Sequence, residues 1–210
     1  MPGLAASPLI FENIKLPEAQ FETQLLEWDV PLDNETLAAY AKRMAAKVTK
    51  PNPVLIGVSF GGILVQEMAA YLDTRKVIII SSVKCNTELP RRMIVAKKTG
   101  AYKLLPISLL MNIEKLAKFS FGNTINKRLK LYEKYLAVRD KRYLDWAIEQ
   151  VVLWDRCKAD DTVIHIHGDA DEIFPIRYIH NPIVVKGGTH IMILNKYKWL
   201  NEQLPQIILS

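Results

Sequence analysis

Gly57-Val58-Ser59-Phe60-Gly61 follows the apolar run 54–56 and precedes residues 62–71, whose apolar spacing suits a helix. A serine between two glycines, at a turn from strand to helix, is typical of a nucleophile elbow. Glycines are needed there because the turn is tight and side chains would collide with the neighbouring strand and helix. We therefore predict that Ser59 is a nucleophile. One alternative is an incidental serine in a glycine-rich connection, and a phosphate-binding loop is a weaker one, because its Lys-Ser/Thr pair and G-x-G-x-x-G are absent.

The composition is that of one packed domain. The chain has 210 residues, of which 50% are hydrophobic, so we expect a single domain over 1–210 with a sizeable core. Its two cysteines, Cys85 and Cys157, lack metal-type spacing, which disfavours a disulfide framework and makes a reducing cytoplasm the default location. No signal peptide or membrane-spanning run is evident, so we expect no stable membrane insertion.

Positive charge is concentrated in one segment. Residues 84–142 hold 15 Lys and Arg against four acidic residues, in a chain whose net charge is +6. Such a segment could attract nucleic acid, anionic lipid or an anionic substrate, but a solvated helical surface is the simpler interpretation. No zinc-finger spacing or aromatic-rich RNA-binding strand accompanies the charge, so nucleic acid is not an expected partner.

Apolar β-branched runs alternate with helical patterns along the chain. Four runs are expected as buried strands and a fifth, shorter run is a further candidate: 54–58, 77–81, 162–167, 183–186 and 24–28. Continuous hydrophobicity suits parallel strands that are covered on both faces. A helix is expected from Leu37 to Val48, with Asp33 or Asn34 as its cap and Pro51 beyond its end. The alternation predicts an α/β fold with a doubly wound, mostly parallel sheet.

Residues 84–157 interrupt this alternation. They contain no convincing strand but several helical patterns, one over 109–119 and another through 129–148. We expect a helical lid inserted between two core strands, because ligands bind at loops and insertions at the carboxyl end of a parallel sheet. The amphipathic stretch 104–121 could instead lie on a membrane surface, which is a less common arrangement.

A serine nucleophile needs a base, and the base needs an acid to orient it. Among the four histidines, His190 follows the 183–186 strand across a glycine pair and is expected at the same sheet edge as the elbow. His165 and His167 are expected to be strand residues with local hydrogen bonds rather than metal ligands, since no third ligand has a recognisable spacing. His180 is expected in a surface turn.

Three acidic residues in the loop after the third strong strand are candidates for the orienting acid: Asp169, Asp171 and Glu172. Spacing alone does not choose among them. The choice comes from a resemblance to a known family.

The chain resembles the serine-dependent branch of the α/β-hydrolase superfamily in three places. They are the elbow, the H-G-x-x-D-x-x-[hydrophobic]-P segment at 167–175 and the Gly-Gly-x-His segment at 187–190. The resemblance implies a triad of Ser59 as nucleophile, Asp171 as orienting acid and His190 as base. It also implies a helical cap where residues 84–157 lie.

The resemblance further implies an oxyanion hole made of two backbone N–H groups. One is that of Phe60, and the other is expected from the segment Pro2-Gly3-Leu4-Ala5, with the N–H of Leu4 as the candidate. The strand that leads into this loop in the family has no counterpart in the sequence. We therefore expect Leu4 at a frayed terminus and a central strand without a neighbour.

These observations predict hydrolysis of an ester or thioester through an acyl-enzyme, on a small-molecule acyl substrate, with no metal or cofactor. An apolar acyl group and an anionic leaving portion, such as a coenzyme A thioester, fit the composition of the expected lid. The alternative is a catalytically impaired hydrolase-like binding protein, because the N-terminal strand is missing. A third interpretation places the basic lid against anionic lipid, and an exposed sheet edge would permit a homodimer.

Overall fold

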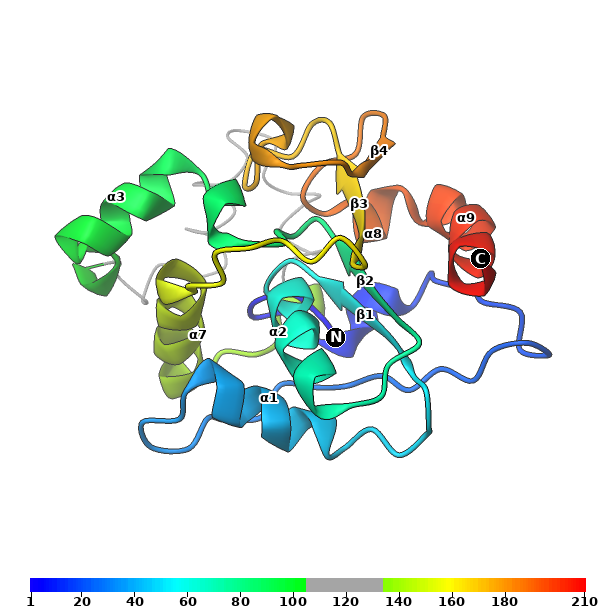
Figure 1. Cartoon of the computed structure of the whole chain (residues 1–210), viewed down its shortest axis with the longest axis horizontal. Helices are drawn as coiled ribbons and strands as arrows, with labels where there is room; N and C mark the ends of the chain where they lie inside the picture. Colours follow the sequence, from blue (N-terminus) through cyan, green and yellow to red (C-terminus); the bar gives the residue numbers. More distant parts are fainter. Residues whose placement is uncertain (105–133) are drawn as a thin grey trace.

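The computed structural model describes residues 1–104 and 134–210, and its centre is a four-stranded parallel sheet (Figure 1). In sheet order, the strands are β1 (Val54–Val58), β2 (Lys76–Ile80), β3 (Ile164–Gly168) and β4 (Ile183–Val185). Neighbours pair in parallel, with Gly57 opposite Ile79 and Ile80 opposite Ile166. The carboxyl ends of these strands therefore meet at one edge. The predicted parallel α/β sheet is confirmed.

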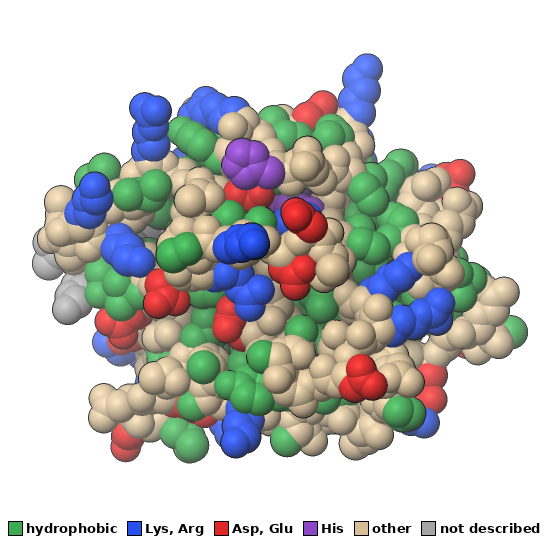
Figure 2. All heavy atoms as spheres, in the orientation of Figure 1, with side chains coloured by type: hydrophobic (Ala, Val, Ile, Leu, Met, Phe, Trp, Pro, Cys, Tyr) green, Lys and Arg blue, Asp and Glu red, His purple; other side chains and the backbone are tan. Residues whose placement is uncertain are grey.

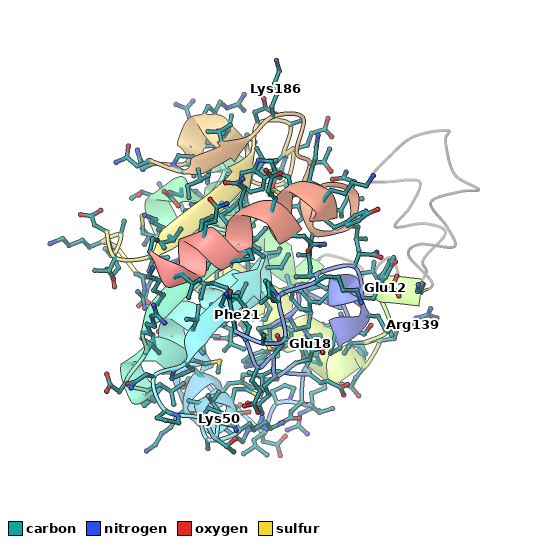
Figure 3. All side chains as sticks on the ribbon, turned by 90° about the vertical axis from the view of Figure 1, so that its right-hand side faces the viewer. Glu12, Glu18, Phe21, Lys50, Arg139 and Lys186 are labelled. Atoms are coloured by element: carbon teal, nitrogen blue, oxygen red, sulfur yellow. The ribbon has the colours of Figure 1, made fainter. Side chains whose placement is uncertain are left out.

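Helices cover both faces of the sheet. In β2, Val77 and Ile79 join one apolar cluster while Ile78 and Ile80 join the other, as the two-residue period of a strand requires. The first face is covered by α1 (Leu37–Ala45), α2 (Phe60–Met68) and α7 (Lys141–Leu153). The second face is covered by η1 (Pro8–Phe11), α8 (Met192–Asn195) and α9 (Tyr197–Leu209). Figure 3 shows α9 crossing this second face.

The predicted strands at 54–58, 77–81, 162–167 and 183–186 correspond to β1 to β4, with ends shifted by at most two residues. The further candidate at 24–28 is wrong, because this segment is not part of the sheet. Its Trp28 instead donates its indole N–H to the carbonyl of Gly3, at 2.9 Å. The outer side of β1 is instead contacted by Met1.

Residues 1–6 are held against the sheet rather than frayed, so that expectation is wrong. The backbone nitrogen of Met1 donates to the carbonyl of Ile56 at 2.7 Å, and its carbonyl accepts from the N–H of Val58 at 3.1 Å. Met1 and Ala5 also join the core on the side of α1 and α2. No other described residue pairs with this side of β1, so β1 is the edge strand of the sheet.

Helix α1 begins three to four residues after the predicted caps. Its N-cap is Thr36, whose hydroxyl accepts from the N–H of Ala39 at 3.2 Å. Asp33 instead forms an ion pair with Arg142 at 2.6 Å. Asn34 has a φ of 55°, which places it in a left-handed turn. Both predicted caps are therefore wrong, because each residue has another structural role.

Between β2 and β3, the described residues form helices and no strand. These helices are η3 (Asn86–Glu88), α3 (Arg91–Thr99), η4 (Ala101–Leu104) and α7. The short helix η2 (Ala69–Tyr71) lies before β2. The described part of 84–157 thus contains helices and no strand, and a further short helix, η5 (Ile176–Tyr178), follows β3. The pattern at 109–119, residues 105–121 of the amphipathic stretch and positions 129–133 lie outside the described residues.

Part of the basic segment is exposed on α3, whereas its first lysine, Lys84, is buried. The α3 side chains Arg91, Arg92, Lys97 and Lys98 are all exposed, and Figure 2 shows Lys and Arg side chains over this helix. None of the helices in the described ranges has the length and hydrophobicity needed to cross a bilayer.

Candidate active site

Ser59 stands at the turn between β1 and α2, at the carboxyl edge of the sheet. Its φ of 53° and ψ of −121° are disfavoured for residues with a side chain and cost about 1–3 kcal/mol. Hydrogen bonds hold this backbone in place: its N–H donates to Ile80 at 2.9 Å, and its carbonyl accepts from Gly62 at 2.8 Å and from the Ser82 hydroxyl at 2.7 Å. These hydrogen bonds therefore stabilise the strained backbone conformation of Ser59.

The two glycines of the elbow are required by close backbone approach. A Cβ on Gly57 would lie 2.2 Å from the carbonyl oxygen of Gly61, and a Cβ on Gly61 would lie 2.3 Å from that of Pro2. Both distances are too short for any side chain. Gly57 thus allows β1 and α2 to meet, and Gly61 allows the N-terminal segment to pass beside the elbow.

His190 links Ser59 to Asp171. Its Nε2 lies 2.9 Å from the hydroxyl of Ser59 and its Nδ1 lies 2.9 Å from Oδ2 of Asp171. Asp171 follows β3 and His190 follows β4, so the carboxyl ends of three strands supply the three groups. Because a carboxylate only accepts, Nδ1 of His190 carries the hydrogen and Nε2 is free to accept from the serine. The structure thus brings together the three residues selected from the sequence.

The carboxylate of Asp171 is prepared to stay ionised. Its side chain is fully buried, and Oδ1 accepts from the N–H groups of Ile173 at 2.8 Å and Phe174 at 2.9 Å. Burial opposes ionisation, but the bond to His190 and the N–H of Phe174 outweigh it and hold the pKa of Asp171 below its usual value. At neutral pH this carboxylate can therefore stabilise a positive charge on His190.

The N-terminal loop lies beside the Ser59 hydroxyl. A side chain on Gly3 would approach to 3.3 Å from Cβ of Ser59 and 3.9 Å from its Oγ. Trp28 bonds the carbonyl of Gly3 and stacks on Phe60, with ring centroids 4.9 Å apart. In the described part of the chain, the backbone N–H groups of Leu4 and Phe60 have no protein acceptor.

No protein-family model and no curated protein matches the sequence, but solved structures match its fold. BpoC of Mycobacterium tuberculosis, provisionally described as a non-heme bromoperoxidase, has a TM-score of 0.71 at 12% identity, covering 100% of this chain and 90% of its own. The esterase RhEst1 of Rhodococcus sp. ECU1013 has a TM-score of 0.59 at 14% identity, covering 100% and 89%. The N-acyl homoserine lactonase AidH has a TM-score of 0.61 at 13% identity, covering 99% and 86%. This chain has the α/β-hydrolase fold.

The other two candidates for the orienting acid, Asp169 and Glu172, have no described hydrogen bond to His190. Asp169 accepts from the backbone N–H of Gly187 at 2.6 Å, and the side chain of Glu172 is exposed. Of the three acids, only Asp171 has a described hydrogen bond to His190. Spacing could not make this choice, because all three lie within four residues of one another.

The remaining histidines lie as expected. His165 and His167 are buried in β3, with Nε2 of His165 3.0 Å from Nδ1 of His167, so their predicted local hydrogen bonds are confirmed. His180 is exposed. Within residues 1–104 and 134–210, no three His, Cys, Asp or Glu side chains form a group that could hold a metal ion.

Three supporting residues of the site were missed from the sequence. They are Trp28, which anchors Gly3; Ser82, which bonds the backbone of Ser59; and Arg92, which bonds the loop of Asp171. Each contact joins residues more than 20 positions apart, so no local pattern shows it. Only Trp28 offered a signal, because a buried indole N–H needs an acceptor.

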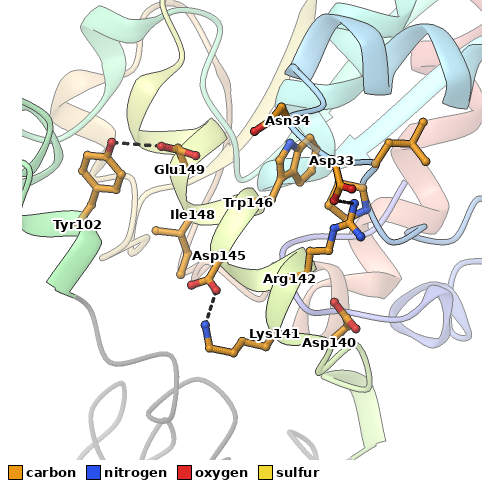
Figure 4. A pocket seen from close by; sticks show the side chains of 12 residues that line it. Asp33, Asn34, Tyr102, Asp140, Lys141, Arg142, Asp145, Trp146, Ile148 and Glu149 are labelled. Atoms are coloured by element: carbon orange, nitrogen blue, oxygen red, sulfur yellow. Dashed lines mark hydrogen bonds and ion pairs between the residues drawn. The ribbon is translucent and has the colours of Figure 1, made fainter.

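A groove of about 800 Å³ lies elsewhere in this α/β-hydrolase fold, between the 31–34 loop and α7 (Figure 4). Charged side chains that line it pair with each other, Lys141 with Asp145 at 2.7 Å and Arg142 with Asp33 at 2.6 Å. Its lining contains none of the three residues joined through His190. The groove is therefore separate from the candidate active site.

Proposed function

We propose that this protein is a serine hydrolase that cleaves an ester-type bond through an acyl-enzyme. The proposal is carried by one observation, the hydrogen-bonded chain Ser59–His190–Asp171 with both links at 2.9 Å. A serine hydroxyl alone is a weak nucleophile, and this arrangement supplies both a base and a group that orients the base. Esterases with similar folds support the same reaction class, although identities of 14% and 17% do not identify a substrate.

In the acylation step, the Ser59 oxygen attacks the substrate carbonyl as its proton passes to Nε2 of His190. The carboxylate of Asp171 stabilises the resulting imidazolium through Nδ1–H. The N–H groups of Phe60 and Leu4 would bind the oxygen that becomes negative, a contribution of roughly 10²–10³ in turnover for each donor. The carbonyl carbon then loses its alcohol or thiol, which takes the proton from His190.

The same groups hydrolyse the acyl-enzyme, with His190 acting first as a base toward water and then as an acid toward the Ser59 oxygen. His190 takes a proton from water, and the hydroxide attacks the ester that links the acyl group to Ser59. The serine oxygen leaves with the proton from His190, and the free acid departs. Atoms and charges balance without a redox partner.

Fluorophosphonate labelling of the purified protein tests the proposal. We expect a covalent adduct on the wild type and none on Ser59→Ala. Ser81→Ala is the matched control, because Ser81 directly follows β2, is fully buried and also has a positive φ, of 49°. It should label like the wild type. A wild type that resists labelling would favour the alternative of a hydrolase-like binding protein.

A substrate panel tests the bond type. We propose an ester or thioester of an apolar acyl group, and p-nitrophenyl esters of graded chain length would be compared with acyl thioesters. Turnover that depends on Ser59 would place the substrate in one of these classes. If fluorophosphonate labels Ser59 but neither series is turned over, the assignment of Ser59 as nucleophile stands and the proposed substrate class is wrong.

A further inference from the structure

Two buried histidines form a hydrogen-bonded chain that leads to the acid loop. A carbonyl oxygen only accepts, so the 2.8 Å contact with the carbonyl of Phe174 means that Nε2 of His167 carries the hydrogen. Nδ1 of His167 must then accept, and it receives the hydrogen of Nε2 of His165 at 3.0 Å. Burial lowers the pKa of both imidazoles, so both are neutral near pH 7 and each has one tautomer.

His167 also faces the carboxylate of the proposed triad. Its Nε2 lies 3.6 Å from Oδ2 of Asp171, the same oxygen that bonds His190. The side chains of His167 and Asp171 are both fully buried, so bulk water does not screen this contact. Asp171 is therefore flanked by two imidazoles, one in the triad and one outside it.

The turn that carries Asp171 is held through its carbonyl groups. Nη2 of Arg92, on α3, donates to Glu172 at 2.8 Å and to Ile173 at 2.7 Å, and His167 donates to the next carbonyl, that of Phe174. Arg92 is exposed, so water competes with its bonds, whereas the bond from His167 is buried. His167 is therefore the stronger restraint on this turn.

We infer that His167 is a positioning residue for the triad. It fixes the turn at Phe174 and, through that turn, the carboxylate of Asp171 that orients His190. His165 supports it, because a donor at Nδ1 keeps the hydrogen of His167 on Nε2. The inference rests on the proposed function, since it assigns His167 a part in keeping His190 aimed at Ser59.

His167→Asn and His167→Gln form a matched pair for the first test. The amide nitrogen of glutamine reaches the position of Nε2 and can donate to Phe174, whereas that of asparagine reaches only the position of Nδ1. We expect His167→Asn to lower kcat about 10–100-fold with KM changed less than about twofold, and His167→Gln to recover most of the loss. Wild-type kcat in His167→Asn, or equal losses in both variants, would overturn the inference.

A second pair keeps the test decisive if the His167 variants do not fold. His165→Leu removes the donor to Nδ1 of His167, so the tautomer is no longer fixed, and His165→Gln restores an amide N–H there. We expect a lower kcat in His165→Leu and rescue in His165→Gln. A His165→Leu variant with the kcat of the wild type would contradict the inference.

A measurement without turnover separates this inference from the proposed function. In Ser59→Ala labelled with ¹⁵N-histidine, exchange of the His190 Nδ1–H with water reports how firmly Asp171 holds it. We expect exchange about tenfold faster when His167→Asn is added, and little change with His167→Gln. Unchanged exchange would overturn the inference, whereas a wild type that fluorophosphonate fails to label would overturn the proposed function alone.

Discussion

The turn of Ser59 and the turn of Asp171 are built by opposite means. At Ser59 the sequence requirement is steric, because Gly57 and Gly61 leave no room for a side chain, and hydrogen bonds then hold the strained backbone of Ser59. At Asp171 the determinants are mainly polar, because hydrogen bonds from β3 and α3 hold the loop, and close backbone packing is confined to its start, where Gly168 lies against Gly188. One half of the site is thus specified within five consecutive residues, and the other half by residues far away in the sequence.

The largest effect is expected from Asp171→Asn, which removes the charge of the polar turn. The asparagine amide would donate to Nδ1 of His190 and force the opposite tautomer, so Nε2 could not accept from Ser59. We expect kcat to fall about 10⁴-fold. Steady-state kinetics with the best substrate of the panel measures this.

Asp169→Asn is the control for that prediction, because Asp169 lies in the same loop but bonds Gly187 instead of His190. It should keep activity within about tenfold of the wild type, since the asparagine oxygen can still accept from the N–H of Gly187 and only an exposed charge is lost. If the two variants lost activity equally, the charge of Asp171 would not be the determinant.

Gly57→Ala tests the steric turn. The added Cβ would meet the backbone of Gly61 at 2.2 Å, so β1 and α2 must separate, and we expect the free energy of unfolding to fall by about 3 kcal/mol. Gly100→Ala is the comparison, because nothing lies within 4 Å of its Cβ and only the φ of 70° is unfavourable, at about 1 kcal/mol. Urea denaturation of both variants checks this. Equal losses would mean that close approach at Gly57 does not matter.

The pH dependence of stability tests the polar turn. Burial, reinforced by His167 and Lys84, depresses the pKa of folded His165, so the unfolded chain binds the proton first as the pH falls below about 6.5. His165 therefore adds stability above that pH and loses it below, at up to about 1.4 kcal/mol per pH unit. His165→Gln should flatten the slope by up to this amount between pH 6.5 and 5 in urea titrations. An unchanged slope would contradict a buried neutral His165.

The smallest effect is expected at Trp28, which supports the loop beside the elbow. Trp28→Phe keeps an aromatic ring against Phe60 but removes the donor to Gly3, whose carbonyl still accepts from Ala6 at 3.1 Å. We expect a loss of about 1 kcal/mol in the free energy of unfolding. Calorimetry or urea denaturation measures it, and a stability equal to the wild type would show that the indole N–H is dispensable.

The same contrast explains what could be predicted from the sequence. The elbow and the four strands of the sheet were predictable because glycine spacing and runs of Val and Ile act locally. Asp171 was selected over Asp169 only by a family pattern. The two residues differ in their hydrogen-bond partners, His190 and Gly187, which lie near them only in the folded chain. The wrong strand prediction at 24–28 has the same cause, because its Trp28 is buried in the core through contacts with distant residues and bonds Gly3 instead of joining the sheet.

The contact between Gly61 and Pro2 couples the position of helix α2 to the position of the N-terminal segment. Gly61 sits in the first turn of α2, and only its missing side chain lets the Pro2 carbonyl lie against it. Any bulk added at this point would push the opening segment of the chain away from the helix and tilt the helix itself. A substitution at Gly61 that is meant to reshape the surroundings of Ser59 must therefore be combined with changes in the segment around Pro2.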